Sequence, residues 1–357
     1  MKVKLCGKRN TENIDVEEPP LKKRKMNEED SLRTTSLLEL CRNEEWEYII
    51  DTVRKHVQNW DFKEVDEDGN TPLLLCCKKG ALEVVQKLYI VISRVYFEER
   101  NHSLYSPLLL ACESGNIELV KWLLTKGSSI DELDSKENYC ELVACKHGQL
   151  DLVKYFTRTG LFDKNRKNMF EDGPVTIAAE NGHLELVKYF KLLIPQRIQS
   201  SAFDDKCFKL AAEQGHLETV KWLIENNPLI CKTSDDCIVF AIRSGNLELV
   251  KFLDDKRFSI DEYSGMCLEI ASTKGYIDIL DWLVFEKEYS LQTETSSGTC
   301  IMIAATNLQI DAVIWMLNNG SSIEESGNLS YTCQDILKHN RTFETVKKAM
   351  LTKSSRK

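Results

Sequence analysis

Apolar residues recur along this chain with the spacing of an amphipathic helix. In one copy Leu184, Val187 and Phe190 follow one another at three-residue intervals, which places them on one face of a helix. Close copies of this segment occur along the chain and read SGNIELVKWLL, HGQLDLVKYF, NGHLELVKYF, QGHLETVKWLI, SGNLELVKFL and KGYIDILDWLV. This self-similarity predicts a repeat protein built from helices.

A glycine stands at the start of each copy and defines the length of the repeat. Neighbouring glycines are 30 to 35 residues apart, at Gly80, Gly115, Gly148, Gly182, Gly215, Gly245 and Gly275. The same spacing puts weaker copies at Glu44, Leu308 and Arg341, which occupy the glycine position. The pattern therefore predicts ten units, of which the terminal ones are degenerate.

A first, shorter helix is expected in each unit, beginning eight residues before the glycine. Small residues such as Ala178-Ala179 stand just before the glycine and let neighbouring helices approach closely. Glycine ends this helix because it readily adopts the left-handed backbone conformation, which a Cβ atom disfavours. A polar loop then leads from each second helix to the next unit.

These features resemble the ankyrin-repeat family. The fullest matches are the segments DGNTPLLLCCKKG at 68–80 and IAAENGHLELVK at 177–188. The resemblance implies an all-α ankyrin-repeat solenoid of paired antiparallel helices with β-turn fingers, covering residues 34–350. The histidine of the family motif is absent and Thr-Pro is intact only at Thr71-Pro72, so we expect lower stability than in a consensus array.

The segments outside this array differ from it in composition. Residues 1–33 carry nine Lys and Arg against seven Asp and Glu, contain little to bury, and are expected to be a disordered arm. Residues 351–357 are expected to form a short tail.

The chain has 13 cysteines, and eleven of them fall at two positions of the repeat. A charged N-terminus without an apolar segment predicts that the chain is not secreted, so these cysteines are expected to be reduced. Six stand where the family has proline, at the start of the first helix: Cys140, Cys207, Cys237, Cys267, Cys300 and Cys333. Five stand in or beside the small-residue pair: Cys41, Cys76, Cys77, Cys112 and Cys145.

Two interpretations of these thiols compete. They pack as small apolar residues, or, since a helix N-terminus lowers a thiol's pKa, they form a redox or metal-binding column. Neighbouring helices lie about 8 to 10 Å apart, whereas a disulfide needs Cα atoms within about 7 Å, so we expect packing only. Because proline preorganises the first turn of a helix, Cys207→Pro or Cys237→Pro is expected to raise the melting temperature.

No residue pattern points to catalysis. Phosphate-binding, dinucleotide-binding, GxSxG and HExxH motifs do not occur, and the six histidines do not form a ligand set. The longest apolar stretch, Leu88–Phe97, is far shorter than the roughly 20 residues of a membrane span. We therefore expect no enzymatic activity, no cofactor, no metal site and no membrane segment, and we expect a monomer.

One aromatic residue recurs in each second helix, seven positions after the glycine position: Trp122, Tyr155, Tyr189, Trp222, Phe252, Trp282 and Trp315. Such a row would suit base stacking, but packing between repeats is favoured because basic residues do not surround it. The lysines on this helix each follow an acidic residue by three positions, at Lys121, Lys154, Lys188, Lys221 and Lys251. They are expected to form ion pairs that neutralise this face.

Acidic residues concentrate at the finger tips. The repeat array carries a net charge of −11 once the +2 arm is set aside. The candidate partner-binding residues are Glu67, Asp68, Asp134, Glu137, Glu171, Asp172, Asp204, Asp205, Asp235, Asp236 and Glu262. Turns favour aspartate in any case. A negative edge would nevertheless attract a basic segment of a partner protein and repel nucleic acid.

The arm contains basic clusters that resemble a bipartite nuclear localisation signal. These are Lys8-Arg9 and Lys22-Lys23-Arg24-Lys25, separated by 12 residues. A solvated run of charge is the alternative. The signal implies an import receptor as partner and a nuclear or nucleocytoplasmic protein.

The sequence thus predicts a non-catalytic scaffold that binds a protein through its concave finger and first-helix surface. The alternative is an adaptor or pathogen-type effector, whose N-terminal arm recruits machinery to a target held by the repeats.

Overall fold

The computed structural model describes residues 36–56, 60–92, 98–169, 172–193, 201–227, 236–256, 258, 260–295, 297–322, 324 and 333–354. Within these ranges the chain is all α, with two isolated β-bridges and no strand, which confirms the predicted fold class.

Ten helix pairs follow one another in the described ranges, and we number them repeats 1 to 10. The first helices are α1 (Leu37–Arg42), α3 (Pro72–Lys78), α5 (Pro107–Ser114), α7 (Cys140–Lys146), α9 (Pro174–Glu180), α11 (Ser201–Glu213), α14 (Cys237–Ser244), α16 (Ser264–Lys274), α18 (Cys300–Thr306) and α20 (Cys333–His339). The second helices are α2 (Trp46–His56), α4 (Leu82–Val91), α6 (Ile117–Thr125), α8 (Leu150–Thr159), α10 (Leu184–Leu193), α12 (Leu217–Asn226), α15 (Leu247–Asp255), α17 (Ile277–Asp281), α19 (Ile310–Asn318) and α21 (Phe343–Ser354). A short 3-10 helix, η3 (Asp261–Tyr263), precedes α16, and a π-helical turn, η4 (Trp282–Glu286), continues α17.

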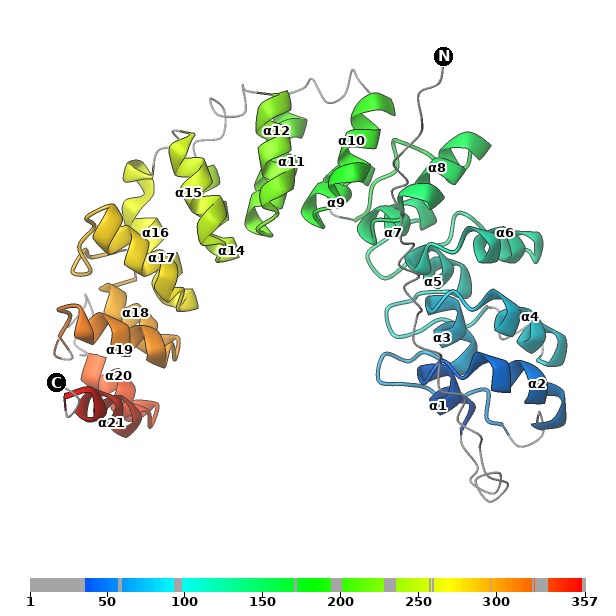
Figure 1. The fold of residues 1–357 in the computed structure, drawn as a ribbon, viewed down its shortest axis with the longest axis horizontal. Coiled ribbons are helices and arrows are strands. Elements are labelled where there is room, and N and C mark those ends of the chain that lie inside the picture. The colour runs from blue at the N-terminus through cyan, green and yellow to red at the C-terminus, as the bar shows by residue number, and fades with distance from the viewer. Residues whose placement is uncertain are drawn as a thin grey trace, which may run out of the picture.

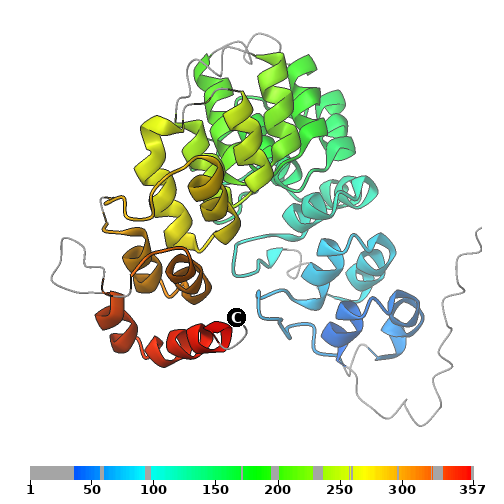
Figure 2. The same cartoon turned by 60° about the vertical axis from the view of Figure 1, so that its left-hand side comes forward.

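The pairs stack into an arch (Figure 1), which Figure 2 shows from a second side. The first helices α3, α5 and α7 lie on its inner side and the second helices α4, α6 and α8 on its outer side. Each first helix packs against the next, and the small residues at these contacts, such as Ala144 and Ala178, are fully buried. Close packing on one side shortens that side, which is why the stack curves towards its first helices.

The glycine position has the predicted conformation throughout. Gly115 ends α5 with φ 74° and Gly245 ends α14 with φ 76°. The non-glycine residues in the weaker copies keep the same geometry, with φ values of 57° at Glu44, 58° at Leu308 and 60° at Arg341. The three degenerate units therefore follow the backbone path of the others despite their side chains.

The residue after the glycine joins neighbouring repeats. The side-chain amide of Asn116 donates to the carbonyl of Gly80 at 2.8 Å, and Nε2 of His183 lies 2.8 Å from the carbonyl of Lys146. Nε2 of His216 makes the same contact with Glu180 at 2.9 Å. His183 and His216 thus hold repeats together.

The described cysteines are all buried thiols that form no disulfide, as expected of small apolar residues. Burial raises the pKa of Cys145 well above its ordinary value and that of Cys267 to about 12, so these thiols stay protonated. The packed thiols of neighbouring repeats can still touch, since Sγ of Cys41 lies 3.3 Å from Sγ of Cys76. The distance between helix axes does not limit the approach of side chains that point towards each other.

In two repeats, the cysteine aligned with the family's proline does not stand at the start of the first helix. Cys140 and Cys300 begin their helices, but Cys207 lies in the middle of α11 and Cys267 within α16. Cys237 begins α14, yet the residue before it has ψ 2°, a conformation that a following proline disfavours. The predicted stabilisation by Cys207→Pro is therefore wrong, and Cys237→Pro is a poor site.

Candidate protein-binding surface

The loops that enter the first helices form fingers with a shared turn. In the finger of repeat 2, Oδ1 of Asp66 accepts hydrogen bonds from the backbone of Asp68 at 3.0 Å and of Asn70 at 2.7 Å. Asp134 makes the same turn in repeat 4 with Lys136 and Asn138. An aspartate at this position mimics a backbone turn, which explains the acidic residues found there.

Backbone hydrogen bonds connect successive finger tips. His102 N donates to Asp68 O at 3.0 Å, and Ser135 N donates to Ser103 O at 3.0 Å. The Nδ2 group of Asn101 donates to Oδ1 of Asn70 at 2.9 Å, below the tips. The fingers of repeats 2 to 4 thus form one continuous edge.

Two of the predicted binding residues are buried within their fingers. Asp134 is 5% exposed and its carboxylate bonds its own finger, while Asp172 is 9% exposed and pairs with Lys206 at 2.6 Å. Their role in the structure is to shape and anchor fingers. They do not belong to the exposed surface.

Lysines pair with three further predicted residues. Lys78 lies 3.8 Å from Asp68, and Lys209 lies 3.2 Å from Asp205 and 3.0 Å from Asp236. Asp205 lies within the first helix α11, so its predicted place at a finger tip is wrong, and lysines of first helices partly neutralise all three carboxylates. This pairing needs the tertiary structure, since each pair except Lys209–Asp205 joins separate elements.

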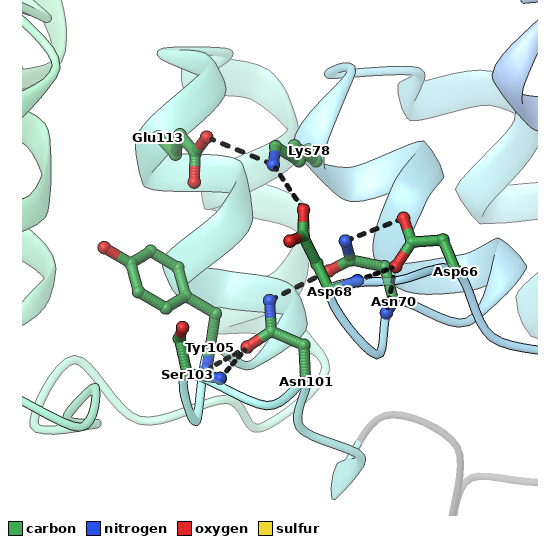
Figure 3. A network of polar contacts seen from close by, with 8 residues as sticks. All are labelled: Asp66, Asp68, Asn70, Lys78, Asn101, Ser103, Tyr105 and Glu113. Atoms are coloured by element: carbon green, nitrogen blue, oxygen red, sulfur yellow. Dashed lines mark hydrogen bonds and ion pairs between the residues drawn. The ribbon is translucent and has the colours of Figure 1, made fainter. Parts of the chain in front are cut away.

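Lys78 links the finger of repeat 2 to the next first helix (Figure 3). Its Nζ lies 3.8 Å from Asp68 and 3.9 Å from Glu113 on α5. Burial raises the pKa of Glu113, and Lys78 opposes that shift. The inner surface at repeats 2 and 3 therefore presents mixed rather than purely negative charge.

Three predicted residues are exposed and take part in no ion pair within the described part of the chain. Among the ion pairs of the described residues none involves Glu67, Glu137 or Glu262, and all three side chains reach the surface, Glu262 from η3. Glu171 and Asp235 lie outside the described residues, as do Lys8, Arg9, Lys22, Lys23, Arg24 and Lys25. Asp204 is on α11, but its side chain is outside the description.

Sequence reasoning missed apolar residues at the finger tips. Val65 is 50% exposed, Leu104 is 49% exposed and Met169 is 54% exposed. Leu104 and Glu137 have φ values of 61° and 59° at the finger position that Gly69 occupies with φ 79°. Aligning the fingers on Gly69 would have revealed both residues, and strained tip residues of this kind are often retained for function.

Four of the five lysines that recur in the second helices form the expected ion pairs. Lys121 and Lys188 pair with the acidic residue three positions earlier, at 2.6 and 2.7 Å, while Lys251 instead reaches Glu286 of the next repeat at 2.8 Å. Lysine ammonium groups also lie over aromatic rings of the row, such as Lys191 over Trp222 at 5.1 Å. These rings are partly buried and covered by lysines, which favours packing over base stacking.

One carboxylate is buried at a position where most of the other repeats have apolar residues. Glu141 is fully buried in α7, 3.2 Å from the guanidinium of Arg166, which also pairs with Asp131. Burial raises the pKa of Glu141 to about 7, although Arg166 opposes the shift.

The described residues contain no group of three or more potential metal ligands. Nor does any helix in the described ranges have the length and apolar character to span a membrane. A surface hollow of about 630 Å³ lies between α15 and α17, and the Lys251–Glu286 pair is part of its lining.

Comparison with known families agrees with the stacked helix pairs. A model of three ankyrin repeats matches residues 45–134, 141–234 and 208–295, so the matches span most of the array. A search of curated proteins found no match. The repeat spacing, the left-handed cap, the finger turn and these matches together show that the chain belongs to the ankyrin-repeat family.

Proposed function

We propose that this protein is a non-catalytic scaffold that binds a protein partner through its finger tips and first helices. Ankyrin repeats are generally protein–protein interaction modules and are typically non-catalytic. The observation that carries the proposal is the exposed Leu104 on the finger edge, between the fingers that carry Glu67 and Glu137.

The partner's chemistry follows from these tips. Glu67 and Glu137 are exposed carboxylates, and no ion pair among the described residues involves them. A basic segment with an apolar side chain would satisfy both charge and burial there. Asp68, Asp205 and Asp236 contribute less, because lysines already pair with them.

The test compares the finger edge with the outer face. Full-length Glu67→Lys/Glu137→Lys protein should lose captured partners that Glu118→Lys/Glu185→Lys protein retains, because the control reverses two exposed outer-face charges. Binding of the partner to the wild-type protein should weaken as the salt concentration rises. Partners that bind the finger variant unchanged, or binding that ignores salt, would contradict the proposal.

We further propose that Lys22-Lys23-Arg24-Lys25 directs nuclear import through an import receptor. The motif is the support for this proposal, and the effector role remains an alternative. A fluorescent fusion carrying Lys23→Ala/Arg24→Ala should shift from nucleus to cytoplasm, and unchanged nuclear signal would refute the assignment. Deleting residues 1–33 and finding the same captured proteins would argue against an effector whose arm recruits machinery.

A further inference from the structure

Two buried thiols from adjacent repeats are in direct contact. Sγ of Cys41 on α1 lies 3.3 Å from Sγ of Cys76 on α3, and neither residue is exposed. A disulfide bond is about 2.05 Å long, so the two sulfur atoms need only a small further approach to reach bonding distance. Cys77, the next residue along α3, is equally buried and points elsewhere, since its thiol makes no such contact with Cys41 in the described structure.

Access to this pair depends on repeat 1. The helices of repeat 1 pack against those of repeat 2, so among the described repeats it has a neighbour on one side only. Terminal repeats of a stack open locally at lower free energy than internal ones. Opening this single contact would expose Cys41 and Cys76 together, because both are buried between α1 and α3.

We propose that Cys41 and Cys76 form an oxidation-dependent disulfide that fastens repeat 1 to repeat 2. The oxidant is a peroxide. One thiol loses its proton, and its sulfur attacks an oxygen of hydrogen peroxide. An S–O bond forms, the O–O bond breaks, and the leaving hydroxide takes up the proton as water, which leaves a sulfenic acid. The second thiol then displaces water from the sulfenic acid, so two thiols and one peroxide give one disulfide and two waters.

The bond would act on local opening rather than on the fold. It would close a loop between positions 35 residues apart and restrict the open state of repeat 1. Disulfides of intracellular proteins are usually transient and redox-sensing, which suits a reversible link of this kind.

A second pair of thiols supplies an internal comparison. The thiols of Cys140 on α7 and Cys112 on α5 are close enough to interact, but this pair lies between repeats 3 and 4. Both of those repeats have neighbours on each side, so exposure there requires the opening of internal contacts. The Cys41–Cys76 bond should therefore form at least tenfold faster than a Cys112–Cys140 bond.

The experiment treats full-length protein with hydrogen peroxide, blocks remaining thiols with N-ethylmaleimide and follows disulfide-linked peptides by mass spectrometry. A Cys41–Cys76 peptide should appear first, vanish in Cys41→Ser and persist in Cys77→Ser, the matched buried control. Amide hydrogen exchange of α1 and α2 should slow at least tenfold after oxidation and recover with a reductant.

Three results would overturn the proposal. One is that Cys76 links to Cys77 instead of Cys41, and another is that Cys112–Cys140 forms as fast as Cys41–Cys76. The third is oxidation to sulfinic acid without a link. If Cys41→Ser disturbs folding, Cys41→Ala and the order of link formation in the wild type still decide the matter.

Discussion

Leu308 shows how a single residue can keep a backbone path that it does not favour. It follows α18 with φ 58°, at the position where most repeats have glycine, and its side chain is 54% exposed. A left-handed conformation costs a residue with a Cβ atom about 1 to 2 kcal/mol. The half-exposed side chain recovers only part of this cost by packing.

Leu308→Gly is therefore expected to stabilise the protein by about 0.5 to 1 kcal/mol, measured by urea unfolding. Leu192→Gly is the control, because Leu192 is 83% exposed but lies within α10, where glycine weakens the helix. A loss of stability in Leu308→Gly would show that its packing outweighs its backbone strain.

Glu141 makes stability depend on pH. Burial raises its folded-state pKa to about 7, above the ordinary value of 4.5, so the native state holds this proton more tightly than the unfolded state does. The contribution is complete below pH 4.5 and is lost as pH rises towards and through 7.

Glu141→Gln cannot lose a proton at this position. As the pH rises from 5 to 8, its free energy of unfolding should therefore increase by about 1 to 3 kcal/mol relative to that of the wild type. Unfolding by urea at both pH values measures the change. Glu118→Gln removes an exposed carboxylate, and its free energy of unfolding relative to wild type should change by a few tenths of a kcal/mol at most between the two pH values. The interpretation fails if the relative stability of Glu141→Gln is the same at both values.

At the scale of elements, the start of each first helix decides what its cysteine can tolerate. Cys300 begins α18, and the preceding Thr299 is extended with ψ 155°, the conformation that proline favours in the residue before it. Cys207 is the seventh residue of the 13-residue α11. The repeat pattern assigns Cys300 and Cys207 to the same position because it counts back from the glycine position at the end of each helix, whereas the helices begin at different distances from that end.

Cys300→Pro should increase the free energy of unfolding by about 0.4 to 1 kcal/mol and so raise the melting temperature slightly. Proline already occupies the same position in three other repeats, at Pro72, Pro107 and Pro174. Cys207→Pro should lose about 3 kcal/mol through a missing hydrogen bond and a ring clash. Thermal unfolding of both variants tests this contrast. Equal effects would mean that α11 starts later than the structure shows.

At the scale of the whole molecule, repeats are coupled through their glycine positions. A Cβ atom on Gly182 would lie 2.4 Å from Nδ1 of His216, whereas one on Gly160 would meet nothing within 4 Å. Their backbones match closely, with φ values of 73° and 74°. The two sites thus separate backbone strain from contact between repeats.

Gly160→Ala should cost about 1 kcal/mol, and Gly182→Ala should cost about 1 to 3 kcal/mol more because His216 must leave the carbonyl of Glu180. Weakening one contact should also divide the stack, so unfolding of Gly182→Ala should broaden and hydrogen exchange should rise in the helices beside it. Equal losses in the two variants would show that His216 does not couple repeats 5 and 6.

Much of the architecture was predictable because a repeat records its contacts locally. Period, apolar stripe and glycine position fix helix pairs whose neighbours in space are their neighbours in sequence. The same reasoning placed Glu44, Leu308 and Arg341 correctly, since backbone geometry at the cap is a local property.

Other features depend on distances between repeats, and only the tertiary structure decided them. These include the contact of Cys41 with Cys76 and the pairing of Lys209 with Asp236. The sequence by itself determined the fold class, and it predicted the side of the stack where we propose that a partner binds. The structure decided which charges remain available there, because pairing and burial depend on side chains that meet across repeats.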